Sequence, residues 1–288
     1  MAVSANTFIV QLLNGLSIGL SIALIASGLT LIFGVMDIVN FAHGEFYMIG
    51  AYGTVALVPI VGNFWVALVG AVIITVVISL LMERLTLKPL RGRDPLQSLI
   101  VTFGFVLVFQ QLALEIFGGS PLDMPTPITG TLSIAGITYP WIRIATIVGA
   151  TIILTALFLF LSRTRLGIMM RASADDLDTA RTLGVPADRV FSLSIGISAV
   201  LAALAAPFLA PIRGVTPTMG AGVIIPAFIV VIVGGLGSVT GAVVAALIIG
   251  MIEAMAVLFI PPFTAQIISL GVLILVLLVR PEGLFGGN

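Results

Sequence analysis

Long apolar runs separated by short polar stretches fill most of this 288-residue chain. Each long run could form a membrane-spanning helix, since about 20 apolar residues cross ~30 Å of hydrocarbon. The runs lack the alternation typical of barrel strands, and open strands would leave backbone groups unpaired in lipid. The nine runs are Phe8–Val35, Phe41–Val58, Trp65–Met82, Leu99–Phe117, Ile144–Leu161, Val190–Pro211, Val223–Val233, Val243–Ile260 and Phe263–Val279. The pattern predicts an all-α fold, a polytopic transmembrane helical bundle of about eight or nine membrane segments that forms a single domain over residues 1–288.

The seventh run is too short to span a bilayer alone, and a glycine-rich stretch follows it. We expect a helix break at Gly234, Gly235, Gly237 and Gly241. The stretch imitates the glycine turn of dinucleotide-binding proteins, but Thr240 stands where the third glycine should be. The parallel sheet that supports such a turn is also missing from the pattern. We therefore predict a half-helix or a short span with a buried, unwound end, and favour a segment that crosses the membrane over one that re-enters.

The first run leads, without a basic loop, into a stretch that mixes polar and apolar residues. Its polar members are Asp37, Asn40, His43, Glu45 and Tyr47. Ionisable groups near hydrocarbon are costly unless they are paired or hydrated, so they usually line a path or a buried joint. We expect a broken helix whose polar side chains line a translocation path. The alternative is an ordinary cytoplasmic turn between two helices.

The composition supports a membrane protein and excludes several kinds of chemistry. The chain is 60% hydrophobic and only 8% charged, with a mean hydropathy of +1.29, whereas soluble domains carry roughly 25% charged residues. Twelve basic and twelve acidic residues balance, which gives no general attraction for nucleic acid. The chain has no cysteine and one histidine, which argues against a metal site. Neither a phosphate-binding loop nor a catalytic constellation is present, so we expect no cofactor, no catalytic residue and no enzyme.

The basic residues are concentrated in two loops. One loop carries Arg84, Lys88, Arg91 and Arg93, and the other carries Arg163, Arg165, Arg171, Arg181 and Arg189. The intervening loop, Gly118–Pro140, has none. Because cytoplasmic loops are enriched in lysine and arginine, the two basic loops are expected inside and Gly118–Pro140 outside. Counting spans then places the N-terminus outside and, if the seventh run crosses, the C-terminus inside.

The second basic loop, residues 163–189, is the only extended amphipathic segment. Leu177, Ala180, Leu183 and Gly184 recur at helical spacing and predict one apolar face, with charged residues on the others. A short helix outside the membrane needs a surface to pack on. Mixed charge makes anionic lipid a poor match, so we favour a protein partner, with a solvated connecting helix as the alternative.

Several buried carboxylates leave a second mechanism open. Glu45, Glu115 and Glu253 lie in or near apolar runs, together with Asp37, and could carry protons across the membrane. Gln110 and Gln111 precede Glu115 by about one helical turn, and we expect both glutamines to form hydrogen bonds between helices. A secondary transporter or channel for a small solute is therefore the alternative function.

Two stretches near the first break resemble a known family. Gly28–Val35 (GLTLIFGV) followed by Asn40–Tyr52 (NFAHGEFYMIGAY) is similar to the signature of permease subunits of bacterial branched-chain amino acid ABC importers, the LivH type. Gly234–Ser238 and the closing Arg280–Gly286 (RPEGLFG) resemble later motifs of the same family. Asp178–Gly184 (DTARTLG) resembles the E-A-A-x-x-x-G element by which ABC permeases dock their ATPases, with aspartate for glutamate and threonine for the first alanine. The resemblance implies a docking loop that includes Arg171, Ala174, Asp175, Asp178, Ala180, Leu183 and Gly184.

The resemblance also implies a fold and a set of partners. The fold would be that of a type II ABC importer permease in the bacterial inner membrane. A second homologous permease subunit, two cytoplasmic ATP-binding subunits and an extracytoplasmic substrate-binding protein would complete the transporter within membrane lipid. The substrate would be leucine, isoleucine, valine or a related solute such as urea, a short amide or another amino acid.

Overall fold

The computed structural model describes residues 4–134 and 136–286, apart from the side chains of residues 213, 262, 263, 265 and 266. The expected domain also includes residues 1–3, 135 and 287–288, which lie outside the described residues. The elements are α1 (Ala5–Met36), α2 (His43–Val61), α3 (Phe64–Met82), a π-helix (Glu83–Leu87), α4 (Lys88–Leu90), α5 (Pro95–Phe117), β1 (Thr131–Ile134), β2 (Ile137–Pro140), α6 (Trp141–Arg163), α7 (Arg165–Asp175), α8 (Leu177–Thr182), α9 (Ala187–Arg213), α10 (Met219–Gly234), α11 (Val239–Ala256) and α12 (Pro262–Val279).

Each of the nine predicted runs coincides with a helix. Among the described residues, seven helices are long and apolar enough to cross a membrane, whereas α10, with 16 residues, is shorter. The fold is therefore the predicted helical membrane bundle. The only paired strands in the described part are β1 and β2, an antiparallel hairpin in the loop expected outside.

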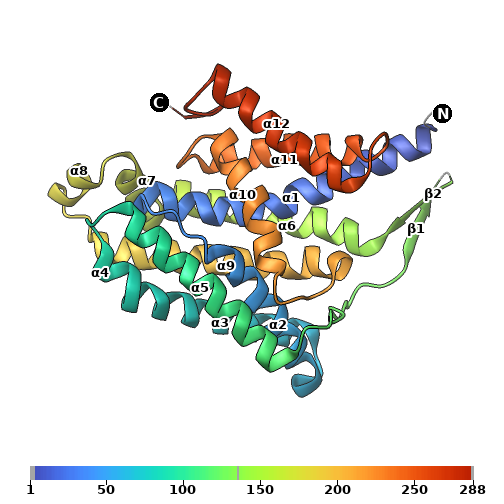
Figure 1. Ribbon diagram of the computed structural model, residues 1–288, viewed down its shortest axis with the longest axis horizontal. Helices are drawn as coiled ribbons and strands as arrows, with labels where there is room; N and C mark the ends of the chain where they lie inside the picture. Colours follow the sequence, from blue (N-terminus) through green and yellow to red (C-terminus); the bar gives the residue numbers. More distant parts are fainter. Residues whose placement is uncertain (1–3, 135, 287–288) are drawn as a thin grey trace.

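Helix α1 forms the centre of the bundle, with α9, α10 and α11 packed around it (Figure 1). Its contact with α11 is close because glycines face each other. A Cβ atom added to Gly19 would lie 2.8 Å from the carbonyl oxygen of Ala246, and one added to Gly250 would lie 2.6 Å from the backbone of Gly19. Small residues that allow such close approach are a common means of helix association in lipid, where burial of apolar surface gives little driving force. Gly19 and Gly250 therefore allow the backbones of α1 and α11 to pack closely.

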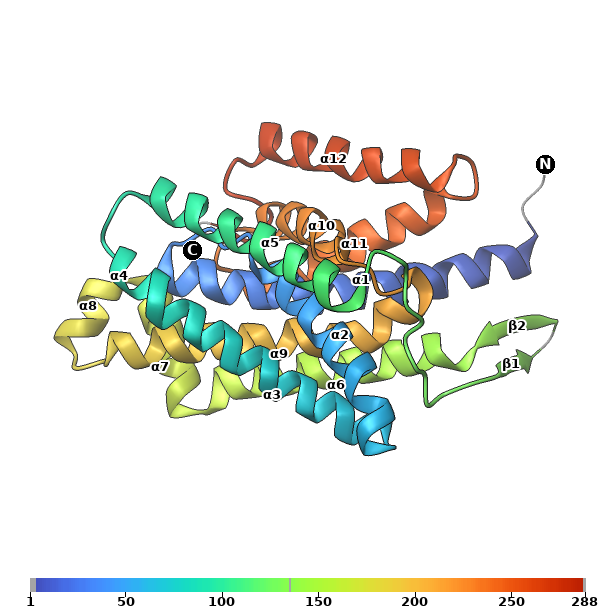
Figure 2. The ribbon, with the colours of Figure 1, turned by 60° about the horizontal axis from the view of Figure 1, so that its bottom comes forward.

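The two ends of the bundle carry different elements. Helices α4, α7 and α8 lie at one end together with the C-terminus, and the hairpin lies at the other end with the N-terminus (Figure 1, Figure 2). Both basic loops are thus at the same end. Helix α10 begins four residues after Val215, and Val215 pairs with Leu122 of the Gly118–Pro140 loop. The other end of α10 lies beside α1 at the basic end. Together with the preceding connection, α10 therefore leads the chain from one end to the other.

A network of charged side chains joins the first basic loop to α9. Arg91 forms ion pairs with Glu83 and with Asp188 (2.7 Å), and its guanidinium lies 4.4 Å from the ring centroid of Phe191. Ser192 donates a hydrogen bond to Glu83 (3.1 Å). The π-helix that begins at Glu83 is a departure from regular helix that is frequent at functional sites. The sequence pattern does not predict this network, which fixes the end of α3 to α9.

Candidate functional site

Helix α2 begins in the middle of the bundle rather than at its end. Helix α1 stops at Met36, Asp37 adopts a left-handed conformation (φ 51°), and residues 38–42 return toward the interior as irregular backbone. At the first residue of α2, Nε2 of His43 donates to the carbonyl oxygen of Ile25, 11 residues before the end of α1 (2.9 Å). The predicted helix break is confirmed, and it places a polar segment deep inside apolar helices.

Glycine leaves the space that the His43 ring occupies. A Cβ atom at Gly28 would lie 2.8 Å from the ring and 3.1 Å from the carbonyl oxygen of Ser198. The hydroxyl of Ser198 also donates to the carbonyl oxygen of Gly28 (2.6 Å). The imidazole is therefore held in a slot between α1 and α9, and it is not exposed at all.

The carboxylate of Glu45 lies between three helices. Its Oε1 accepts a hydrogen bond from Nε2 of Gln110 on α5 (2.9 Å). A Cβ atom at Gly220 of α10 would lie 2.6 Å from the carboxylate, so any larger residue there would displace the carboxylate from this position. The expected hydrogen bond between helices is confirmed for Gln110. It is wrong for Gln111, which bonds to Glu115 of its own helix because both side chains face outward.

The N-terminal ends of α2 and α10 meet at Glu45. Gly44 packs against Gly220 and Ile224, and Glu45 lies in the first turn of α2. The free N–H groups of a helix N-terminus give it a partial positive charge, which stabilises a nearby carboxylate. Half-helices whose N-termini meet inside a membrane are a common way to build a site for polar solutes.

Several polar atoms in this segment have no hydrogen-bond partner. Both side-chain polar atoms of Asn40, Nδ1 of His43 and Oε2 of Glu45 are buried and unbonded. The side chains of Asn40, His43, Glu45 and Tyr47 are each at most 1% exposed. Burial of an unpaired polar group is costly, so such groups usually bond to water, an ion or a ligand. The structure therefore buries four of the five predicted path residues at and near the start of α2, a group that we call the polar layer. Within it, His43 faces α1 and α9, and Glu45 faces α5 and α10.

Asp37 lies apart from this layer. Its side chain is exposed and lines a hollow of about 260 Å³ that also involves Arg91, Arg93 and Arg181. The expectation that Asp37 lies near hydrocarbon is wrong, because α1 is long enough to carry its last residue to the basic end of the bundle. There, solvent and arginine side chains can stabilise the carboxylate.

The predicted docking loop forms two short helices at the basic end. Residues Arg171, Ala174, Asp175 and Asp178 are exposed, and Ala180 is buried. Leu183 is 78% exposed, so the single apolar face expected for Leu177, Ala180 and Leu183 is only partly correct. Thr182 is the last helical residue and Gly184 has a φ of 85°, so the chain turns at the point where Leu183 would have completed the face. Leu183 instead stands at an exposed tip.

A capping hydrogen bond shapes α8. Asp176 accepts hydrogen bonds from the backbone N–H groups of Asp178 and Thr179 and from the hydroxyl of Thr179 (2.6 Å). These donors, first of all Thr179, hold the pKa of Asp176 below its ordinary value. The carboxylate is thus ionised at neutral pH and caps the helix N-terminus.

The glycine-rich break between α10 and α11 also lies at the basic end. Gly234 and Gly241 approach so closely that a Cβ atom on either would clash with the backbone of the other. Gly235 and Gly237 have positive φ values of 103° and 84°, and the backbone turns sharply between the two helices. The C-terminal segment covers this turn, because the N–H groups of Leu284 and Phe285 donate to the carbonyl oxygens of Val233 (2.8 Å) and Gly234 (3.1 Å). The predicted break and its buried end are confirmed.

Some contributors to the site give only a weak signal in the sequence. Gly28 and Gly220 are two of 31 glycines, and nothing local distinguishes them from glycines that only allow helix packing. Glu83 is a single carboxylate at the end of an apolar run, which could have suggested a buried partner among the arginines that follow. Among the described residues, no group of three histidine, cysteine or acidic side chains could hold a metal ion.

A bundle of apolar helices around a buried polar layer defines a membrane transport permease. Residues 11–277 match the family model of the permease component of branched-chain amino acid transport systems. The chain is 34% identical to the high-affinity branched-chain amino acid transport permease BraD of Pseudomonas aeruginosa, with 97% of this chain and 96% of that protein covered. It is 32% identical to LivH of Escherichia coli K12, with the same coverage, and 25% identical to a probable LivH of Methanocaldococcus jannaschii, with 92% and 88% covered.

The chain belongs to the family of branched-chain amino acid transport permeases. It is a multi-pass permease subunit of an ABC importer and not an enzyme. A solved structure titled PsaBC from Streptococcus pneumoniae in complex with Fab has a similar fold, with a TM-score of 0.51, 12% identity, and coverage of 94% of this chain and 92% of that one. The likeness concerns the arrangement of helices alone.

Proposed function

We propose that this permease translocates leucine, isoleucine, valine or a closely related solute inward, past Glu45. The observation that carries the proposal is the Glu45 carboxylate, which is buried among apolar helices and has one oxygen without a partner. A branched-chain amino acid offers an ammonium group for that oxygen and an aliphatic side chain for the surroundings. The names of the relatives support this choice of substrate.

In this proposal, the translocation path runs between α2, α5 and α10. Glu45 would face the path directly, and Asn40 and Tyr47 would help to hydrate it. His43 would hold the start of α2 against α1 and α9, and Asp37 would lie at the cytoplasmic exit of the path. Helix α5 would form the movable wall, because few of its side chains are buried inside the chain. A shift of α5 would carry Gln110 away and leave both oxygens of Glu45 available to a solute.

We further propose that residues 163–189 dock a cytoplasmic ATP-binding subunit. Leu183 supports this role, since an apolar side chain at an exposed tip can enter a pocket of a partner. The transporter would contain a second homologous permease, two ATP-binding subunits and an extracytoplasmic substrate-binding protein. The N-terminus and the hairpin would lie outside the membrane, and the C-terminus and both basic loops inside. Residues 1–288 would form one membrane domain.

Reconstitution of the transporter tests the proposed function. The chain is assembled in proteoliposomes with a second permease and two ATP-binding subunits from the same organism, and a binding protein is added outside. ATP-dependent accumulation of labelled leucine is expected, with little accumulation when the chain is present alone. Binding proteins loaded with urea or a short amide serve as comparisons for substrate choice.

Two results would contradict the proposal. Accumulation by the chain alone, driven by a proton or sodium gradient, would establish a secondary transporter. Uptake of urea or an amide in preference to all three branched-chain amino acids would retain the ABC importer and overturn the substrate.

A further inference from the structure

We propose that a groove between α6 and α11 holds one anionic phospholipid, with its acyl chain along α1 and its phosphate at Arg171. The groove consists of two adjoining hollows of about 470 Å³ and about 180 Å³. They share the residues Phe158, Val239 and Thr240, so they form one continuous surface. The larger hollow is apolar, and the smaller one contains the polar groups.

The larger hollow has the dimensions of an acyl chain. Leu16 and Leu20 of α1 form its floor, and α6 lines it from Ile147 to Phe158. At 1.5 Å per residue this length of α6 is about 17 Å, close to half of the ~30 Å hydrocarbon core. The length of the hollow therefore suits the acyl chain of one leaflet.

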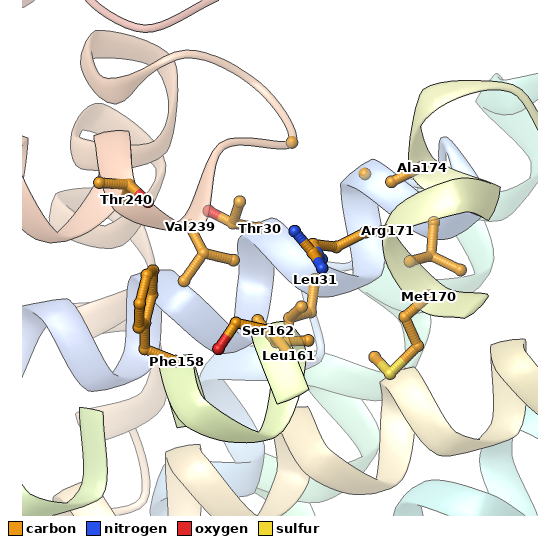
Figure 3. Close-up of a pocket in the computed structure, with 13 residues that line it drawn as sticks. Thr30, Leu31, Phe158, Leu161, Ser162, Met170, Arg171, Ala174, Val239 and Thr240 are labelled. Carbon is orange, nitrogen blue, oxygen red and sulfur yellow. The ribbon is translucent and has the colours of Figure 1, made fainter. Parts of the chain in front are cut away.

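The smaller hollow supplies a site for a charged headgroup. Arg171 reaches across it from α7, above residues of α1 and the end of α6 (Figure 3). Arg171 makes no ion pair with any described residue, and none of the described residues that line the two hollows is acidic. The positive charge is thus free for an anion that lies at the mouth of the apolar groove.

A buried hydroxyl at the same place also lacks a partner. Thr30 is fully buried, its Oγ1 makes no hydrogen bond, and it lines the smaller hollow. The hydroxyl groups of Ser162 and Thr240 line it as well. A phosphate diester or glycerol headgroup can bond to hydroxyl groups and arginine together, and basic pockets on the cytoplasmic side of membrane proteins commonly bind such lipids.

The headgroup, rather than the acyl chain, would set the selectivity of this site. All membrane lipids offer similar acyl chains, and exchange of one for another in the groove gains little free energy. Arg171 favours a net negative headgroup such as phosphatidylglycerol over zwitterionic phosphatidylcholine. The proposal rests on Arg171 being at the cytoplasmic leaflet, as in the proposed topology, but lipid retention can be measured without any transport.

Native mass spectrometry of the assembled transporter tests the site. The complex is mixed in detergent with phosphatidylglycerol or phosphatidylcholine of the same acyl composition, and the lipid retained by this subunit is counted. One phosphatidylglycerol is expected per chain, and Arg171→Gln should weaken its retention about tenfold, as expected for loss of a charge-assisted contact. Arg165→Gln, an exposed arginine of the same helix that does not line the groove, should leave retention unchanged.

A second pair of variants tests the apolar part of the groove. Val244→Trp fills the groove and should displace the lipid, whereas Ile152→Trp places the same side chain on the exposed face of α6 outside it. Equal retention by both arginine variants, or equal retention of the two lipids by the unmodified chain, would overturn the proposal. If Val244→Trp separates the permease subunits without changing lipid retention, the groove is a protein interface instead. Solute uptake is not measured in this test. Arg171 also belongs to the proposed docking loop, so a change in uptake could come from altered docking and not from lipid loss.

Discussion

At the scale of single residues, the contacts of Glu45 determine how the polar layer can bind a solute. Glu45 is held by one side-chain donor, Gln110, and by the space that Gly220 leaves for it. Its second oxygen has no partner although the side chain is buried. A residue of purely structural value would gain stability from a second hydrogen bond. The oxygen without a partner is therefore a sign of function at this position.

We predict that Glu45→Gln lowers ATP-dependent uptake by about tenfold, equivalent to ~1.4 kcal/mol in the barrier, while the protein still assembles. The amide keeps the size of the side chain but removes the charge that would attract an ammonium group. Initial rates of leucine uptake and the amount of assembled complex are the measurements. Glu115→Gln is the matched control, because Glu115 is exposed and bonds only within α5. Equal uptake by both variants would leave Glu45 a structural residue.

A second prediction concerns the glycine beside Glu45. Gly220→Ala should destabilise the protein by ~1–3 kcal/mol, the usual cost of overpacking, because the added Cβ atom would lie 2.6 Å from the carboxylate. Gly222→Ala, in the same helix, has no atom within 4 Å of the added Cβ atom and should be neutral or slightly stabilising. Thermal unfolding in detergent measures both. Similar melting temperatures for the two variants would contradict the observed packing.

At the scale of elements, the basic end combines a part held by ion pairs with a part that projects from the bundle. The network around Arg91 fixes the end of α3 to α9, whereas α8 projects beyond the bundle (Figure 1). Helix α8 has six residues, so its stability depends on its cap and on its contact through Ala180. A partner that pushes on α8 would therefore move α9 through the short connection between them.

Gly184 allows a test of this mechanical role. Its positive φ of 85° is unfavourable for any residue with a Cβ atom, so Gly184→Val should change the turn that presents Leu183. We expect at least a fivefold fall in leucine transported per ATP hydrolysed, with ATPase activity retained. Gly92→Val introduces the same backbone strain (φ 73°) in the other basic loop and should preserve coupling. An equal loss in both variants would show that general strain, not docking, is responsible.

The cap of α8 predicts a pH response. The pKa of Asp176 is lowered in the folded protein, so its contribution is complete above the ordinary pKa of aspartate and is lost as the pH falls through the lowered value. Hydrogen exchange of residues 177–182, corrected for intrinsic rates, should thus show the same protection at about pH 7 and about pH 5. Asp176→Ala should remove that protection and Asp176→Asn, which keeps an acceptor, should retain part of it. Unchanged exchange in Asp176→Ala would exclude the capping role.

At the scale of the whole molecule, apolar run length was enough to predict the membrane helices. The break before His43 was also predictable, because polar residues without lysine or arginine interrupt an apolar run. The position of Asp37 was not predictable, since it depends on how far α1 extends. The contacts of Gly28 and Gly220 depend on which helices are neighbours, and a single sequence does not contain that information. The helical spacing predicted that Leu183 would lie on the apolar face of α8. The helix ends at Thr182, however, because the chain turns at Gly184.

The orientation of the bundle can be measured with single cysteines, because the chain contains none of its own. Asn6→Cys and Asp123→Cys should react with a membrane-impermeant thiol reagent added outside intact cells. Thr182→Cys should react only after the membrane is opened. All three positions are exposed, so accessibility depends on the side of the membrane. The opposite pattern would invert the proposed topology.

The connection between α1 and α2 has a consequence for the speed of transport. The polar layer lies only about 17 Å from the end of α1, at 1.5 Å for each residue after Ile25. Residues 37–42, which contain no regular helix, line part of that remaining distance. A movement of this connection would need a change in only a few backbone dihedral angles, without unravelling a helix inside lipid. Opening of the bundle at the basic end should then have a low activation enthalpy, and the slow, temperature-sensitive step should be the movement of whole helices at the hairpin end.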